Sequence, residues 1–114
     1  MAITHERRRT PRAPGDFPIR MTQRAEGRSG IVVDISENGL CCTYPEAIQE
    51  MTLVNIDLQL PTGKDSHTVQ GAVVRCEKRR DVSPPTYEVA VYFTELPPEA
   101  RSELRDYVAR SASK

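Results

Sequence analysis

The sequence contains no tryptophan, and aromatic residues make up only 5% of its 114 residues. Its hydrophobic core must therefore be built mainly from valine, isoleucine and leucine. Cysteine and histidine are also scarce, with three and two residues, and no C-x-x-C pair is present, so a zinc site is not expected. An odd cysteine count argues against a disulfide framework and favours a reduced, cytoplasmic protein.

Long apolar runs are absent as well. No stretch approaches the roughly 20 residues that a membrane-spanning helix needs, and the arginine-rich start lacks the apolar segment of a signal peptide, so we expect no membrane insertion. No nucleophile stands in a recognisable pattern with a base, and no phosphate-binding glycine loop or metal-ligand set occurs. We therefore expect that the protein is not an enzyme and needs no cofactor.

Charge of one sign is not in excess, because 16 basic residues balance 16 acidic ones. The distribution is uneven, however: residues 1–30 carry seven arginines and three acidic residues, a balance of +4, which leaves −4 for the rest of the chain. Residues 1–15 also contain two prolines and a glycine and show no apolar periodicity. They predict a flexible, arginine-rich arm that stays out of the core.

Residues 16–96 contain six short apolar segments that predict β-strands, at 17–24, 30–36, 40–44, 51–60, 68–77 and 87–94. In the clearest of them, Val54, Ile56 and Leu58 alternate with polar residues, which predicts one buried and one solvated face. This alternation is typical of antiparallel sheets, in which strands adjacent in sequence pair. Because an open sheet would expose its edges, we predict a mainly all-β fold, a six-stranded antiparallel barrel.

Residues 97–114 predict a C-terminal α-helix and tail. Pro98 suits a first helical turn, and four apolar residues recur at helical spacing. These residues are Ala100, Leu104, Tyr107 and Val108. We expect this amphipathic helix to pack against the outside or one end of the barrel, so that arm, barrel and helix form a single domain.

The first candidate binding motif is the run Arg7-Arg8-Arg9-Thr10-Pro11-Arg12, in which Arg8 and Arg12 form an R-x-x-x-R pattern. A guanidinium group donates hydrogen bonds in a planar fork that matches phosphate oxygens and the O6/N7 edge of guanine, and it stacks on purine faces. Taken alone, such a run is more often a solvated basic tail or a weak electrostatic contact with nucleic acid, so it does not by itself identify a ligand.

The second motif, D-x-S-x-x-G, comprises Asp34, Ser36 and Gly39 and lies between two predicted strands. Asn38-Gly39 is a strong hairpin signal, which explains these two residues structurally. Asp34 is harder to explain this way, because a carboxylate at the end of an apolar strand must find donors or stay at the rim. A carboxylate also accepts well from the N1–H and N2–H₂ edge of guanine, so the motif could form a guanine pocket.

RRTPR at 8–12 followed by DISENG at 34–39 closely resembles the two-part motif of PilZ domains. The segments VQGAVVRCE at 69–77, YEVAVYF at 87–93 and LPPEARSELRDYV at 96–108 are similar to the later strands and closing helix of that family, so the resemblance covers nearly the whole chain. It implies a six-stranded β-barrel with a C-terminal helix. It also implies that the bacterial second messenger cyclic di-GMP is held between the arginine arm and the barrel surface.

The resemblance assigns a role to each matching residue. Arg8 and Arg12 would bind guanine edges and phosphates, Asp34 and Ser36 would hydrogen-bond guanine, and Gly39 would shape the turn.

Arg7 precedes the R-x-x-x-R motif and could engage the phosphates and purine face of a second ligand. We therefore predict that two intercalated molecules of cyclic di-GMP bind to each chain.

A receptor of this kind would change its surface on binding cyclic di-GMP and regulate an unidentified effector protein in trans, in motility, exopolysaccharide production or a related signalling output. One alternative is a PilZ-fold protein–protein adaptor that does not need the nucleotide, which the intact motifs disfavour. Another is a small barrel that binds RNA or single-stranded DNA. The acidic balance and few aromatic residues of 31–114 argue against nucleic acid as a partner.

Overall fold

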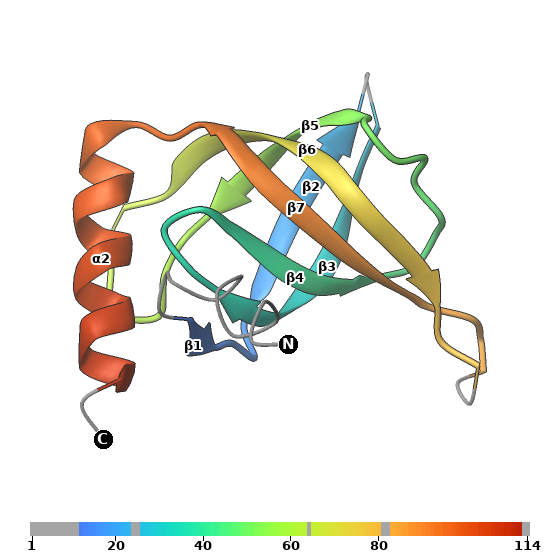
Figure 1. Ribbon diagram of the computed structural model, residues 1–114, viewed down its shortest axis with the longest axis horizontal. Helices are drawn as coiled ribbons and strands as arrows, with labels where there is room; N and C mark the ends of the chain where they lie inside the picture. Colours follow the sequence, from blue (N-terminus) through green and yellow to red (C-terminus); the bar gives the residue numbers. More distant parts are fainter. Residues whose placement is uncertain (1–11, 24–25, 64, 81–82, 113–114) are drawn as a thin grey trace, which may run out of the picture.

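A computed structural model describes residues 12–23, 26–63, 65–80 and 83–112, which form seven strands and one helix (Figure 1). In chain order these elements are β1 (Ala13–Pro14), β2 (Pro18–Gln23), β3 (Glu26–Ile35), β4 (Gly39–Tyr44), β5 (Leu53–Leu58), β6 (His67–Lys78), β7 (Tyr87–Glu95) and α2 (Pro98–Ala112). Antiparallel pairing runs in the order β1-β3-β2-β5-β6-β7-β4, and a β3–β4 pairing closes β2 to β7 into a six-stranded barrel. The predicted fold is confirmed, with β1 as an added short strand.

Strands adjacent in sequence pair within the barrel, with one exception. β4 lies beside β7, where Leu40 is opposite Val91, and β5 lies beside β2, where Ile56 is opposite Met21. The segment 45–52 connects β4 to β5 across the barrel and places Ile48 in the core. Closure of the barrel therefore depends on two strand pairs that no short turn connects.

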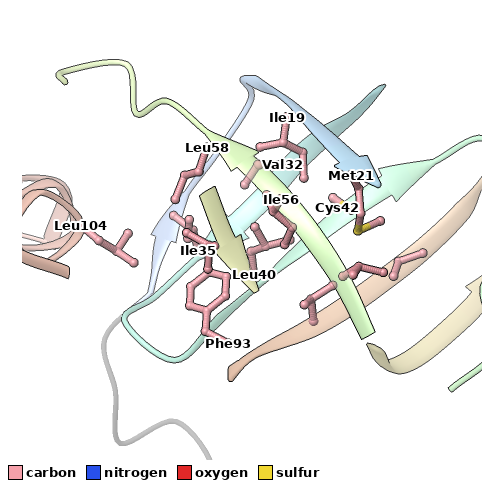
Figure 2. Packing of buried hydrophobic residues seen from close by; sticks show 14 of the residues in the cluster. Ile19, Met21, Val32, Ile35, Leu40, Cys42, Ile56, Leu58, Phe93 and Leu104 are labelled. Carbon is pink, nitrogen blue, oxygen red and sulfur yellow. The ribbon is translucent and has the colours of Figure 1, made fainter. Parts of the chain in front are cut away.

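Aliphatic side chains from alternate strand positions fill the barrel (Figure 2). β5 shows the rule most clearly, because its burial alternates strictly and Val54, Ile56 and Leu58 are all at most 1% exposed. Each such side chain contributes about 1.5–3 kcal/mol by leaving water. The pattern that predicts β5 from the sequence is therefore the pattern that builds the core.

α2 stands at one end of the barrel and directs its apolar face inward (Figures 1 and 2). Ala100, Leu104 and Val108 are buried, as predicted, and Tyr107 packs against the core at its edge. The Tyr107 ring meets the Phe17 ring edge to face, with centroids 6.1 Å apart. The helix thus covers the barrel end next to β1.

The last residues of the predicted arm belong to the fold. Ala13 is fully buried and lies opposite Ile35, and the Gly15 N–H donates to the Val33 carbonyl over 2.7 Å. The prediction that residues 1–15 stay out of the core is therefore wrong for this part, because a two-residue strand is too short to show periodicity. Residues 1–11, which include Arg7 and Arg8, lie outside the described residues.

Candidate functional site

The D-x-S-x-x-G motif forms the end of β3, a tight turn and the start of β4. The Ser36 N–H donates to the Gly39 carbonyl over 2.8 Å, and the Ser36 hydroxyl donates to the same oxygen and accepts from the Asn38 N–H over 3.4 and 3.1 Å. The Asn38 carbonyl in turn accepts from the Phe93 N–H of β7 over 2.8 Å. The expected hairpin is confirmed, and hydrogen bonds hold it both within the turn and to β7.

Gly39 is required here by close approach to another strand. No glycine among the described residues has a positive φ, so this turn does not use the left-handed conformation that favours glycine. A Cβ at Gly39 would instead overlap the carbonyl oxygen of Val91 in β7. Glycine therefore lets β4 begin directly against β7 and keeps the turn close to the barrel wall.

Two β-bulges expose consecutive side chains on either side of this region. In β3 the register shifts between Val32 and Asp34, so that Val33 and Asp34 both face outward. In β6 it shifts between Val73 and Arg75, and Val74 and Arg75 are both exposed. A bulge adds a residue to one strand and redirects the side chains beside it. Each bulge thus presents a valine and a charged residue to the surface.

A row of paired residues joins the two bulges across four strands. Asp34 lies opposite Cys41, Cys41 opposite Ala90, and Ala90 opposite Arg75. The middle of the row carries only small side chains, so the surface is hollowed there. Two adjoining hollows of about 370 and 260 Å³, which share Arg12 and Ala90 in their linings, form what we call the trough.

The trough carries a guanidinium–carboxylate pair on each side. The Arg12 side chain donates from Nε and Nη2 to Asp34 Oδ1 over 2.9 and 2.6 Å, and each of the two side chains is 29% exposed. Across the floor, Arg75 Nη2 lies 3.6 Å from Glu88 Oε1 and donates to Cys41 Sγ over 3.9 Å. The trough therefore contains two guanidinium donors and two carboxylate acceptors within one shallow site.

The adjacent cysteines face opposite sides of β4, as expected for a strand. Cys41 lies on the trough floor, where burial first, and the nearby carboxylates of Glu88 and Asp34 second, raise the pKa of its thiol. Cys42 is fully buried in the core, and burial raises the pKa of its thiol to about 12. Both thiols are therefore neutral at physiological pH.

Four of the predicted site residues are brought together at the trough, namely Arg12, Asp34, Ser36 and Gly39. Ser36 is fully buried and its hydroxyl is used within the turn, so it reaches no outside group in this conformation. The predictions for Arg7 and Arg8 concern residues outside the described part of the chain.

Arg75 and Glu88 are site residues that sequence reasoning missed. The only indication in the sequence concerns Arg75. In Val73-Val74-Arg75, as in Val32-Val33-Asp34, two apolar residues stand side by side and interrupt the alternation of apolar and polar residues. Such a break marks a bulge only once the partner strand is known. Tyr92 and Val74 are exposed and line the smaller hollow, and neither was identified from the sequence.

A larger hollow of about 580 Å³ lies elsewhere, between the strand ends and the start of α2. Half of its lining residues are neutral and polar, such as Asn55, Thr68 and Gln70, and it contains neither motif. We therefore place the site at the trough. Among the described residues, no helix combines the length and apolar character that crossing a membrane requires.

Comparisons with solved structures agree with this architecture. The inhibitor of motility (MotI/DgrA) of Bacillus subtilis has a TM-score of 0.76 at 14% identity, covering 93% of this chain and 51% of that one. The PilZ domain of YcgR from Escherichia coli, solved with c-di-GMP, has a TM-score of 0.70 at 14% identity, covering 94% and 92%. The K. pneumonia MrkH–c-di-GMP complex has a TM-score of 0.69 at 17% identity, covering 90% and 51%.

This chain thus spans about half the length of several proteins that share its fold. No curated protein sequence matches it significantly. The model of one family, the PilZ domain, matches residues 6–110, a range that includes the R-x-x-x-R motif, the D-x-S-x-x-G motif and most of α2. The chain therefore belongs to the PilZ domain family.

Proposed function

We propose that this protein is a receptor for cyclic di-GMP that regulates a partner protein in trans and catalyses no reaction itself. The observation that carries the proposal is the contact between Arg12 and Asp34, which joins the end of the arginine arm to the D-x-S-x-x-G motif at the trough. The family match and the fold shared with c-di-GMP-bound proteins support the same ligand.

The chemistry of the pair suits a guanine nucleotide. Guanine offers O6 and N7 as acceptors to a guanidinium and offers N1–H and N2–H₂ as donors to a carboxylate. Arg12 and Asp34 now satisfy each other, and both are partly exposed, so a guanine can replace each partner without leaving a buried charge unpaired. Arg75 on the opposite side is suited to a phosphate or a second purine face.

Ser36 has an indirect role in this proposal. Its hydroxyl stabilises the turn that presents Asp34, and it would reach guanine only if that turn opened. Arg8 would add a second guanidinium, and Arg7 would engage the second of two intercalated ligands. Ligand binding across arm and barrel creates a new joint surface, which a protein in a motility, exopolysaccharide or related pathway would recognise.

Calorimetric titration with cyclic di-GMP at moderate salt tests the proposal, with GTP and a short RNA as controls. We expect selective binding that Arg12→Ala and Asp34→Asn each abolish, while the free energy of unfolding changes by less than about 1 kcal/mol because the pair is partly exposed. Arg20→Gln, an exposed arginine of β2 that does not line the trough, is the matched control and should bind normally.

The same titration gives the stoichiometry. Two ligands per chain at saturation are expected, and a value of one would refute the intercalated pair while leaving the receptor intact. No binding by the folded wild-type protein would refute the receptor and favour the nucleotide-independent adaptor.

A further inference from the structure

The C-terminal helix α2 contacts both halves of the trough's binding machinery. One contact reaches the turn that follows Asp34, and the other reaches β1, which directly follows Arg12. We propose that α2 is a positioning element of the ligand site, which acts through Glu37 in the turn and through Tyr107 on β1. The inference rests on the proposed function, since it concerns binding of the same ligand.

The contact with the turn is a shared carboxylate. Glu37 lies between Ser36 and Asn38, and its Oε1 accepts a hydrogen bond from Arg105 Nη2 over 3.1 Å. Arg101 Nη1, one helical turn earlier, lies 3.8 Å from the same oxygen. Two guanidinium groups of α2 therefore hold Glu37, a residue of the turn that is not one of the three motif residues.

The contact with β1 is a hydrogen bond supported by ring packing. The Tyr107 hydroxyl donates to the Pro14 carbonyl over 3.1 Å, and its ring packs edge to face on Phe17. Arg12 is only two residues from Pro14. Tyr107 thereby limits how far the end of the arm can move away from β3, where Asp34 lies.

The ion pairs between α2 and Glu37 are expected to affect the placement of the turn more than the global stability of the protein. The Arg101 and Arg105 side chains are 46% and 64% exposed, and ion pairs of this kind add little to global stability. They join the turn to α2, however, with Glu37 and Arg105 68 residues apart, and together with the Tyr107 contact they fix the turn relative to β1. Ligand affinity depends on that relative placement, because Arg12 and Asp34 must meet the same base. By linkage, bound ligand must also hold α2 more firmly.

The test uses Glu37→Gln and Tyr107→Phe in the full chain. Arg28→Gln is the control for the first, since it breaks an exposed ion pair of 2.8 Å with Glu46 that is remote from the trough. Tyr87→Phe is the control for the second, since that ring also packs against the core. Affinity for cyclic di-GMP is measured by calorimetry, and amide exchange of Ser36 and Asn38 is measured without ligand.

We expect Glu37→Gln and Tyr107→Phe each to weaken binding about fivefold to tenfold, with thermal stability unchanged and with less than a twofold effect in both controls. Glu37→Gln should also speed amide exchange of the turn in the free protein. Unchanged affinity in both variants would overturn the inference, as would weaker binding of Glu37→Gln with unchanged exchange, which would indicate direct contact with the ligand. If the wild type binds no cyclic di-GMP, the proposed function fails, and the exchange rates alone then decide whether α2 holds the turn.

Discussion

Inward and outward side chains alternate strictly along β5, whereas a β-bulge interrupts this alternation in β3 and another interrupts it in β6. In β5 every second side chain enters the core, and the outward residues form an ordinary exposed face. In β3 and β6 the bulges place a valine and a charged residue side by side on the outside, while the inward positions before and after them lie in the core or pack against it. Regular alternation therefore builds the barrel, and the bulges at Val33-Asp34 and Val74-Arg75 form the sides of the trough.

The largest effect should come from the regular strand. Ile56→Ala removes a fully buried side chain at the centre of the barrel and should lower the free energy of unfolding by about 2–5 kcal/mol. Leu53→Ala changes an exposed residue of the same strand and should cost less than about 0.5 kcal/mol. Urea unfolding measures both. Similar losses in the two variants would contradict the division between inward and outward positions.

A smaller effect, on binding and not on folding, is expected at the β6 bulge. Arg75→Gln keeps an exposed polar side chain but shortens it and removes its charge from the trough, so affinity for cyclic di-GMP should fall about tenfold with stability unchanged. Lys78→Gln, at the last residue of the same strand and outside the lining of the trough, should bind like the wild type. Calorimetry distinguishes the outcomes, and equal affinity of the two variants would remove Arg75 from the site.

The smallest effect concerns Cys42, the inward neighbour of Cys41. Its pKa of about 12 in the folded protein exceeds the ordinary value of 9.0, so the folded state keeps a proton that the unfolded chain loses above pH 9. This contribution to stability is fully present below pH 9 and is lost between pH 9 and about 12. From pH 8 to 10, the free energy of unfolding should therefore fall by about 1 kcal/mol more in the wild type than in Cys42→Ala. Equal pH dependence in urea unfolding would show that the thiol titrates normally.

Local sequence patterns identified the strands because burial of alternate residues repeats within a few positions, as in Val54, Ile56 and Leu58. The helical face of Ala100, Leu104 and Val108 was predictable for the same reason. The bulges were not, since an extra residue in β3 or β6 is defined only by the partner strand that it fails to match. β1 was missed because two residues cannot show a period.

For the site, the motifs pointed to Asp34, Gly39 and Arg12, and their chemistry suggested guanine. Gly39 is needed because β4 approaches Val91 closely, not because of the turn conformation. The Ser36 hydroxyl forms its hydrogen bonds within its own turn. Arg75 and Glu37 carry no motif that distinguishes them from other charged residues. They stand out only when β6 is placed beside β7 and α2 is placed against the turn.

The sequence by itself determined most of the buried residues, the course of the six barrel strands and the helix, and which side chains have the chemistry to hydrogen-bond guanine, because each of these depends on a side chain and its close neighbours. Only the tertiary structure decided that β4 closes onto β7, that Arg12 meets Asp34, and that α2 holds the turn through Glu37. These contacts join residues far apart in the chain. Their formation depends on how the whole barrel twists and closes, which no local pattern encodes.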